Sequence, residues 1–288
     1  MKIGVLGGSG FVGKHLTKKL IDANYDVVST FNNTKPPEDL EDFYMQVDVE
    51  NDYHLDKFFS TTDIVFYLIH SLEDENVKEK EEHLAKAAGT AMKKNGVKLC
   101  LYLGGPKSES EHLSSREQTY NILKKFVRTS VIRCSAILSK ESKSYKILRT
   151  AGKSLFKVSN EQMKHKTNPI YIDDLTKAIL AIMKEDTLQD EYEIGGPSIS
   201  YEDIINVYAE ECDVGKMPFS IPISLNNPVV TYYISFWADL DHNVTKRLLT
   251  SLLGNLEMQN NAYKTLTGEE PLDFRQIVRI IEKRKRYA

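Results

Sequence analysis

The chain has 288 residues and a formal net charge of -3, with apolar, aromatic and charged fractions that are ordinary for a globular protein. This charge lacks the basic excess of proteins that bind nucleic acids or anionic membranes, so we expect neither partner and predict a small-molecule ligand. No segment reaches the roughly 18 consecutive apolar residues that a membrane helix needs. Residues 221–240 come nearest, but several polar side chains interrupt them.

Cysteine usage and the start of the chain indicate a cellular compartment. The three cysteines, Cys100, Cys134 and Cys212, lack the spacing of a zinc site and of a disulfide framework, so we expect reduced thiols and no metal site. A strand is predicted to have begun by Ile3, which leaves no room for a signal peptide. We therefore expect a cytoplasmic protein, either a monomer or a homodimer.

Short β-rich segments alternate with longer helical patterns over residues 1–135, which is typical of repeated βα units and a parallel sheet. The predicted strands are residues 2–6, 26–31, 44–49, 63–69, 97–103 and 130–134. Val12, Leu16 and Leu20 give the helix between the first two strands an apolar stripe. A long helix is predicted over residues 73–95, and its charge-dense first part, residues 73–82, indicates a solvated face.

The pattern loosens after Cys134. Helices are predicted near residues 144–151, 173–183 and 200–211, and short strands near residues 168–171 and 192–194. Ser200 and Asp203 form an S-x-x-D helix start. The predicted fold class is therefore α/β: a Rossmann-type, doubly wound parallel sheet over residues 1–135 and a smaller C-terminal α/β substrate lobe over residues 136–288. Segments around residues 165–195 either complete the first domain or belong to the lobe. The aromatic-rich residues 217–253 are expected to cover the substrate side of the crevice.

A glycine-rich turn follows the first predicted strand and begins the first helix. Its G-x-x-G-x-x-G spacing lets the chain turn tightly, lets backbone N–H groups approach a pyrophosphate, and lets the helix pack closely on the strand. We therefore predict that the turn holds NAD(P)(H), rather than being a glycine-rich turn without a ligand. The predicted contacts in the turn are Gly7, Ser9, Gly10, Phe11, Val12 and Gly13.

The ends of the later strands predict the rest of the cofactor site, because in a sheet of order 3-2-1-4-5-6 the ligand lies at the carboxyl ends of the strands. Asn32, Asn33, Thr34 and Lys35 follow the second strand, with no carboxylate to bind the ribose 2′-hydroxyl of NAD. These residues can instead accommodate a 2′-phosphate, so NADP(H) is predicted over NAD(H). The contacts predicted after the third, fourth and fifth strands are Asp48, Val49, Leu68, Ile69, His70, Leu103 and Gly104.

Asp48 has two interpretations. Its position at the end of the third strand suits a carboxylate that accepts from the adenine amino group. It also suits a cap for the helix that begins near Asn51.

Several segments resemble the extended and atypical short-chain dehydrogenase/reductases: residues 7–13, 47–49, 70–71, 103–105, 133 and 171–174. More narrowly, the chain resembles their NmrA-like NAD(P)H-binding branch, whose members are often labelled nucleoside-diphosphate-sugar epimerases. The narrower resemblance rests on residues 67–71, 112–116 and 192–197. The resemblance extends to about residue 215. It implies a bound dinucleotide and leaves the reaction open, because the branch includes reductases, redox-sensing regulators and assembly factors.

The resemblance also implies where catalytic groups would lie. Active members of the superfamily use a Tyr-x-x-x-Lys pair and a hydroxyl at the end of the fifth strand. In this chain His112 and Arg116 stand in the Tyr and Lys places, and Gly104-Gly105 replaces the hydroxyl. The catalytic candidates are therefore His70, His112 and Arg116. The alternatives are a solvated histidine at position 112 and a pocket-lining role for His70.

Three other motifs are interpreted as structural. Tyr120-x-x-x-Lys124 matches the catalytic pattern, but it begins eight residues beyond His112, so we predict that Tyr120 packs against a neighbouring helix or a dimer partner. Lys124 is then expected to reach solvent. Arg133 is interpreted as a buried ion-pair partner or loop anchor rather than a substrate clamp. Asp173 and Asp174 are interpreted as an N-cap.

Two functions are compatible with these residues. The first is an NADP-dependent reductase or epimerase that moves hydride between the nicotinamide and an unknown small substrate with a non-standard active site. The second is a non-catalytic NADP(H)-sensing regulatory or assembly-factor protein, an alternative that the missing Tyr, Lys and Ser favour.

Overall fold

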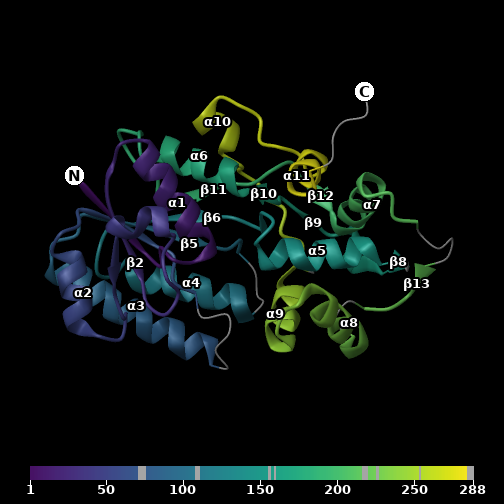
Figure 1. Cartoon of the computed structure of the whole chain (residues 1–288), viewed down its shortest axis with the longest axis horizontal. Helices are drawn as coiled ribbons and strands as arrows, with labels where there is room; N and C mark the ends of the chain where they lie inside the picture. The colour runs from purple at the N-terminus through teal and green to yellow at the C-terminus, as the bar shows by residue number, and fades with distance from the viewer. Residues whose placement is uncertain are drawn as a thin grey trace. The chain divides into compact units, whose positions relative to one another are not determined.

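The computed structural model describes residues 1–70, 76–107, 111–154, 157–158, 160–215, 220–224, 227–252 and 254–283. The chain forms two compact units, whose elements Figure 1 labels. Unit 1 consists of Met1–Gly105, Glu111–Arg133 and Thr176–Tyr192. Unit 2 consists of Pro106–Ser110, Cys134–Leu175 and Glu193–Ala288.

Unit 1 is built on a seven-stranded sheet of order β11-β6-β5-β4-β1-β2-β3. The strands are β1 (Lys2–Leu6), β2 (Asp26–Phe31), β3 (Tyr44–Gln46), β4 (Ile64–Tyr67), β5 (Leu99–Gly104), β6 (Thr129–Arg133) and β11 (Glu191–Glu193). Every pairing from β3 across to β6 is parallel. This order confirms the predicted Rossmann-type sheet, which β11 extends by one strand beside β6.

Two strands end earlier than their sequence pattern indicates. The ladder of β3 closes with the bond from Val47 N–H to the Phe31 carbonyl, and that of β4 closes with the bond from Leu68 N–H to the Leu6 carbonyl. Val49 and Ile69 therefore lie beyond the paired backbone. Apolar residues continue past both ends because the following loops still pack against the core.

Helices cover both faces of the sheet. They are α1 (Phe11–Asp22), α2 (Asp52–Phe59), α3 (Val77–Lys94), α4 (Glu111–Leu123) and α6 (Ile172–Ile182), with a short 3-10 helix η1 (Glu38–Phe43). Figure 1 shows α2, α3 and α4 along one face, and α1 and α6 along the other. Helix α3 ends one residue earlier than predicted, and Gly96 follows with a left-handed φ of +71°. The predicted start of this helix at residues 73–75 lies outside the described residues.

The core of unit 1 lies between the sheet and α2, α3 and α4. Its buried side chains include Leu6, Phe58, Val65, Met92 and Leu123. The apolar stripe predicted for α1 is confirmed, since Leu16 and Leu20 are fully buried.

Unit 2 combines short strand pairs with helices. Its elements are β7 (Ile137–Leu138), α5 (Lys143–Lys153), β8 (Lys157–Val158), η2 (Glu161–Lys164), β9 (Lys166–Thr167), β10 (Ile170–Tyr171), β12 (Ile199–Ser200), α7 (Tyr201–Glu211), β13 (Ser220–Ile221), α8 (Pro228–Ala238), α9 (His242–Leu252), α10 (Tyr263–Thr267) and α11 (Phe274–Ile281). The pairs β7–β10 and β8–β13 are parallel and β9–β12 is antiparallel. The predicted start of α7 is confirmed, because the Ser200 hydroxyl accepts from the N–H of Asp203.

The interpretation of Asp173 and Asp174 as an N-cap is wrong. Helix α6 begins at Ile172, so both carboxylates lie inside its first turn, where the helix dipole favours negative charge. Asp174 accepts instead from the Tyr263 hydroxyl at 3.2 Å and from the Leu272 N–H at 3.0 Å. This carboxylate therefore ties the C-terminal segment to the rest of unit 2.

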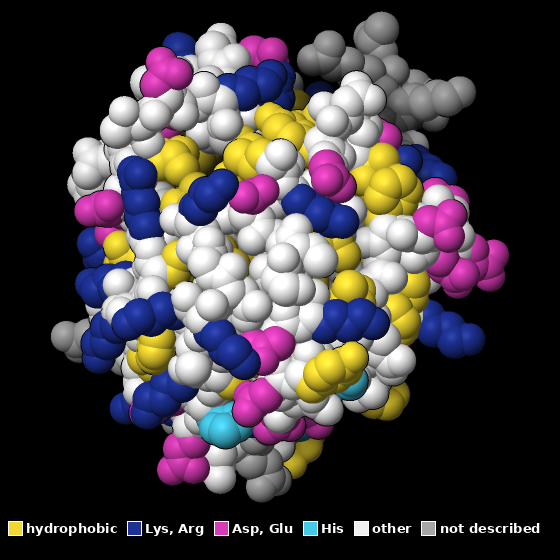
Figure 2. Space-filling view, turned by 90° about the vertical axis from the view of Figure 1, so that its left-hand side faces the viewer, with side chains coloured by type: hydrophobic (Ala, Val, Ile, Leu, Met, Phe, Trp, Pro, Cys, Tyr) yellow, Lys and Arg dark blue, Asp and Glu magenta, His cyan; other side chains and the backbone are white. Residues whose placement is uncertain are grey.

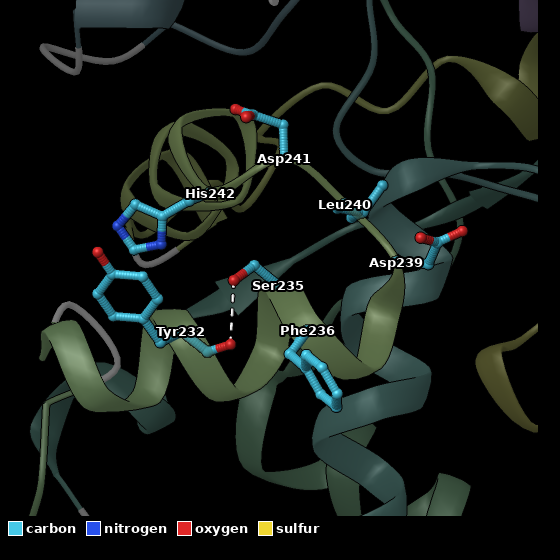
Figure 3. Close-up of a pocket in the computed structure, with 7 residues that line it drawn as sticks. All are labelled: Tyr232, Ser235, Phe236, Asp239, Leu240, Asp241 and His242. Atoms are coloured by element: carbon cyan, nitrogen blue, oxygen red, sulfur yellow. Dashed lines mark hydrogen bonds between the residues drawn. The ribbon is translucent and has the colours of Figure 1, made fainter.

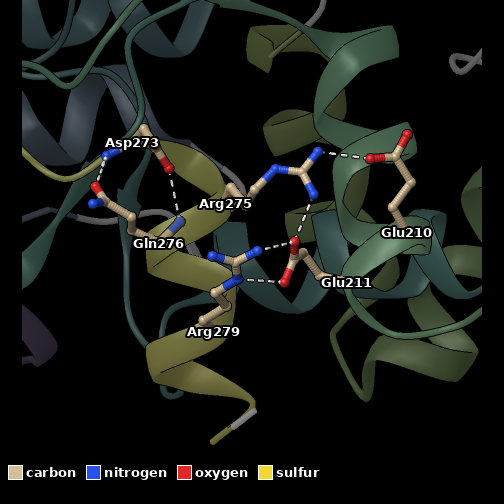
Figure 4. A network of polar contacts seen from close by, with 6 residues as sticks. All are labelled: Glu210, Glu211, Asp273, Arg275, Gln276 and Arg279. Carbon is tan, nitrogen blue, oxygen red and sulfur yellow. Dashed lines mark hydrogen bonds and ion pairs between the residues drawn. The ribbon is translucent and has the colours of Figure 1, made fainter. Parts of the chain in front are cut away.

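The last helix of unit 2 is held by a network of charged groups (Figure 4). Glu211 on α7 accepts from Arg275 at 2.5 Å and from Arg279 at 2.6 and 2.8 Å. These arginines, Arg279 first, lower the pKa of Glu211. Asp273 and Gln276 form a capping box that stabilises the N-terminus of α11. The ion pairs hold the side of this helix that carries Arg275 and Arg279 against α7.

Three features of the molecule bear on the expectations from composition: its surface charge, the polarity of its helices and its cysteines. Acidic and basic side chains lie interspersed over the face shown in Figure 2. Each described helix is too short or too polar to cross a membrane. The three cysteines are free thiols, as predicted, and burial raises the pKa of Cys100 to about 12.

Replacing Leu123, a fully buried residue at the end of α4, by alanine should lower the free energy of unfolding by about 2–5 kcal/mol, because the packed core fills the resulting cavity only in part. The control is Lys125→Ala, which changes an exposed side chain and should alter that free energy by less than about 0.5 kcal/mol. Urea denaturation measures both. Equal stabilities of the two variants would contradict the core assigned to this face of the sheet.

Candidate functional site

The turn between β1 and α1 is anchored to the neighbouring strand β2. The N–H of Gly7 donates to the Thr30 hydroxyl at 2.9 Å, and the N–H of Ser9 donates to the Thr30 carbonyl at 3.0 Å. Gly7 adopts a left-handed φ of +90°, which L side chains rarely adopt. These hydrogen bonds hold the turn against β2 and place the start of α1 at the carboxyl edge of the sheet.

The glycines of this turn serve different purposes. A Cβ on Gly8 would lie 1.7 Å from the Ser29 hydroxyl, and one on Gly13 would lie 2.4 Å from the Gly7 carbonyl, so both are required by packing. A Cβ on Gly10 would meet only the Gly7 carbonyl, at 3.2 Å. Gly10 is exposed, and no side chain caps the helix that follows it. The open space beside Gly10 and the uncapped start of α1 together fit a pyrophosphate.

The residues predicted to contact the adenosine half lie around the ends of β2 and β3. Asn32, Asn33, Thr34 and Lys35 are all exposed. Asn51 caps α2 by accepting from the N–H groups of Tyr53 and His54, so the alternative of Asp48 as that cap is wrong. Asp48 accepts from the N–H of Glu50 at 3.0 Å, within its own loop. Val49 is half-buried against the core.

The end of β4 lies directly beside the turn. A Cβ on Gly7 would lie 3.2 Å from both the Ile69 side chain and the Leu68 carbonyl. The register pairs Tyr67 of β4 with Tyr102 of β5, so Leu68 and Leu103 lie at the same level of the sheet. The structure therefore brings the ends of β4 and β5 together with the glycine-rich turn, as the strand order requires.

His70 follows the end of β4 in a nearly closed environment. Its side chain is 15% exposed, and its ring lies edge-on to the Tyr102 ring with 6.1 Å between centroids. Neither ring nitrogen has a hydrogen-bond partner among the described residues. Oε1 of Glu81 lies 3.9 Å from Nδ1, which is beyond hydrogen-bond range. Burial lowers the pKa of His70, the charge of Arg116 lowers it further, and Glu81 acts in the opposite direction.

Glu81 corrects the interpretation of residues 73–82 as a solvated face. Its side chain is only 3% exposed, and its carboxyl group accepts a hydrogen bond from the Ser115 hydroxyl. The signal was present in the sequence, because Glu81 lies four residues after Val77 and four before Ala85, on the apolar stripe of α3. A carboxylate at such a position is buried rather than solvated.

Arg116 lies near His70 and at the end of β5. A Cβ on Gly105 would lie 2.5 Å from the Leu113 side chain and 3.3 Å from Cδ of Arg116. A side chain at Gly105 would therefore require Leu113 to move. At Gly104, a Cβ would lie 2.8 Å from the Val131 side chain, which would likewise have to shift. The side chain of His112 lies outside the described residues, and so does Ser71.

Tyr120 and Lys124, the pair that matches the catalytic pattern, lie in a different place, beside β11. Arg133 lies there as well. The Tyr120 hydroxyl makes a long hydrogen bond of 3.5 Å to the Asp190 carbonyl, and Lys124 lies 4.9 Å over the Tyr120 ring. Lys124 is exposed, as predicted. Arg133 is buried and forms ion pairs of 2.7 Å with Glu117 and 2.8 Å with Glu191, which confirms its interpretation as an ion-pair partner. That Tyr120 is not catalytic stays a prediction.

Unit 2 contains an open pocket of about 510 Å³ between α8 and α9. Figure 3 shows the Tyr232 ring lying against His242, with 4.0 Å between ring centroids. The other lining residues are Ser235, Phe236, Asp239, Leu240 and Asp241. Phe236 and Trp237 are exposed on the same helix. Whether this segment covers the substrate side of the crevice stays a prediction.

Comparison with known proteins agrees with the geometry of the turn. Residues 7–186 match the model of a protein family described as NAD(P)H-binding. A search of curated proteins finds no match to the sequence.

Solved structures with the same fold cover nearly the whole chain. A nucleoside-diphosphate-sugar epimerase from Staphylococcus aureus has a TM-score of 0.78 at 19% identity, covering 96% of this chain and 99% of that one. The Citrobacter sp. triphenylmethane reductase complexed with NADP(H) has a TM-score of 0.74 at 14% identity, covering 96% and 98%. A UDP-glucose 4-epimerase from Thermotoga maritima, solved with UDP-glucose, has a TM-score of 0.71 at 16% identity, covering 98% of both chains. At these identities the likeness shows a shared fold.

Gly10→Val should abolish dinucleotide binding and change the free energy of unfolding by less than about 1 kcal/mol, because its branched side chain projects into the open side of the turn. Gly13→Ala should instead lower the stability of the fold, since its Cβ would press on the Gly7 carbonyl. Calorimetric titration with NADPH and thermal denaturation separate the two effects. Wild-type affinity in Gly10→Val would show that the dinucleotide lies elsewhere.

Proposed function

This chain belongs to the NAD(P)H-binding family, and we propose that it is an NADP(H)-dependent reductase or epimerase acting on a small alcohol or carbonyl compound. The observation that carries the proposal is the environment of His70. A buried imidazole without a hydrogen-bond partner among the described residues follows the strand end that lies beside the glycine-rich turn. Ionisable groups with perturbed pKa values in such places are candidates for proton transfer.

The residues of the turn fit a dinucleotide. Gly10 and the first turn of α1 would hold the pyrophosphate, while Leu68, Ile69, Leu103 and Gly104 would line the nicotinamide half. Gly7, Ser9, Phe11, Val12 and Gly13 would shape the cradle. The cofactor, when bound, supplies or accepts the hydride.

NADP(H) is the proposed form of the cofactor. Asn32, Asn33, Thr34 and Lys35 are exposed after β2 and offer amide, hydroxyl and ammonium donors. A ribose 2′-phosphate needs such donors, whereas a free 2′-hydroxyl is usually bound by a carboxylate. The carboxylate of Asp48 is proposed to accept from the adenine amino group.

His70 is the proposed proton carrier. Its lowered pKa keeps the imidazole neutral at pH 7, so a ring nitrogen can accept the hydroxyl proton when an alcohol is oxidised. In the reverse reaction the protonated ring returns that proton to the oxygen of the reduced carbonyl. Arg116 is proposed to hold the substrate oxygen or to oppose excess positive charge on His70. His112 is a further proposed proton donor on α4.

A non-catalytic NADP(H) sensor is the second candidate. The observation that favours it is that Gly104 and Gly105 stand where active members of the superfamily carry a hydroxyl. Such a protein would bind the cofactor and turn over no substrate.

Lys35→Met should weaken NADPH binding roughly tenfold, about 1.4 kcal/mol, and leave NADH binding within about twofold, because only NADPH carries the 2′-phosphate. The control is Lys18→Met on α1, which removes an exposed ammonium that pairs with Asp22. Calorimetry with both cofactors measures the change. A tenfold preference of the wild-type protein for NADH would overturn the choice of NADP(H).

Incubation with NADPH and a panel of quinones, carbonyl compounds and sugar nucleotides should show steady cofactor oxidation with at least one class. His70→Asn should then lower kcat by about 10²–10⁴-fold with cofactor affinity unchanged. Substrate oxidation should be independent of pH above neutrality and should fall on acidification, centred below the ordinary histidine pKa of 6.5, because protonation removes the acceptor. His70→Asn should lack this dependence.

The control for this experiment is Tyr120→Phe, which should retain turnover within about threefold. A hundredfold loss of turnover in that variant would indicate that Tyr120 and Lys124 are the catalytic pair. Tight NADPH binding without turnover on any substrate class would favour the sensor.

A further inference from the structure

Glu81 occupies a position that packing alone does not explain. It lies on the face of α3 that carries Val77, Leu84, Ala85 and Ala88 into the core, where an apolar side chain would be more favourable. A buried carboxyl group costs several kcal/mol of desolvation unless partners compensate it. One partner is the Ser115 hydroxyl on α4, which donates to Oε2 and fixes the orientation of the carboxyl group.

The other carboxyl oxygen faces the histidine. Oε1 of Glu81 lies 3.9 Å from Nδ1 of His70, so a movement of about 1 Å or a small rotation of the ring would bring the two within hydrogen-bond range. Catalytic hydrogen bonds are often this long in unliganded proteins and shorten when substrate binds.

The groups that face His70 come from three elements. Glu81 from α3 raises the pKa of His70, whereas the Arg116 charge from α4 lowers it. Tyr102 from β5 presents its ring to the imidazole, and burial raises the pKa of its hydroxyl, which keeps that group neutral. The positive charge of Arg116 and the carboxyl group of Glu81 therefore act on His70 in opposite directions.

We propose that Glu81 is a positioning residue for His70: its carboxyl group binds the Nδ1–H of the imidazole and leaves Nε2 as the nitrogen that exchanges a proton. The role in turnover rests on the proposed function. The effect on the tautomer of His70 does not, because the carboxyl group faces Nδ1 at 3.9 Å without substrate.

The chemistry follows from that assignment. When an alcohol is oxidised, its hydroxyl proton moves to Nε2, its hydride leaves for the cofactor, and the imidazolium keeps its Nδ1–H on Glu81. The carboxylate stabilises this positive charge, as carboxylates do behind catalytic histidines in other folds. In the reverse direction Nε2 returns the proton and the ring becomes neutral again.

The test uses the full-length protein and the variant Glu81→Gln, which keeps the shape and can still accept from Ser115. Nitrogen NMR of the imidazole, with NADP⁺ bound, reports the tautomer and the pKa of His70. The matched control is Glu82→Gln, the next residue, whose carboxylate pairs with Lys86 and Gln118. A second variant, Ser115→Ala, loosens the carboxyl group without removing it.

We expect the Nδ1–H tautomer in the wild-type protein and in Glu82→Gln. In Glu81→Gln the Nε2–H form should appear and the pKa of His70 should fall, because the group that raises it is lost. With a substrate in hand, kcat of Glu81→Gln should fall about 10–100-fold, with KM and cofactor affinity within about twofold. Ser115→Ala should show smaller changes in the same direction.

An unchanged His70 tautomer and pKa in both Glu81→Gln and Ser115→Ala would overturn the inference. If Glu81→Gln does not fold, Ser115→Ala decides alone. A shifted tautomer in a protein without turnover on any substrate would support the positioning role of Glu81 and refute the proposed function.

Discussion

The first turn of α1 packs directly against the backbone of the preceding turn, at Gly13 and Gly7. The rest of unit 1 depends on this close approach of two main-chain segments. A Cβ at Gly13 would lie 2.4 Å from the Gly7 carbonyl, and one at Gly8 would lie 1.7 Å from the Ser29 hydroxyl. Side-chain repacking cannot relieve the first of these overlaps, because the Gly7 carbonyl belongs to the main chain and the main chain fixes the position of a Cβ. The approach sets the helix start at the level where β4 and β5 end. Gly7, Leu68 and Leu103 are therefore brought together by one constraint.

Among the described residues of unit 1, Arg133 and Glu81 are buried charged side chains, and their surroundings differ. Arg133 has Glu117, Glu191 and the Gly105 carbonyl around its guanidinium group, so its charge is matched on several sides. Glu81 accepts from the Ser115 hydroxyl, and its other carboxyl oxygen lies 3.9 Å from Nδ1 of His70. The surroundings of Arg133 hold elements together, whereas those of Glu81 include an ionisable ring that follows the end of β4.

Much of unit 1 could be predicted because its signals are local: the glycine spacing, the alternation of strands and helices, and the Ser200 cap in unit 2 each lie within one stretch of chain. Strand ends were less predictable, since Val49 and Ile69 stay apolar for packing after pairing has ended. Glu81 was misread because its charged neighbours on α3 indicate solvent, and only the helical spacing shows otherwise. Asp174 was misread because its partners, Tyr263 and Leu272, are remote in sequence.

The order in which the chain is synthesised has a consequence for how it folds. One ion-pair partner of Arg133 is Glu191, which is synthesised 58 residues later and is the first residue of the edge strand β11. In unit 2, the hydroxyls of Tyr145 and Tyr208 donate to Glu282, which directly follows the last helix. An emerging chain therefore carries Arg133 without Glu191, and two core tyrosines without Glu282, until those residues have been made. Unit 1 therefore cannot complete its fold before β11 has been made, and unit 2 cannot complete its fold before Glu282 has been made.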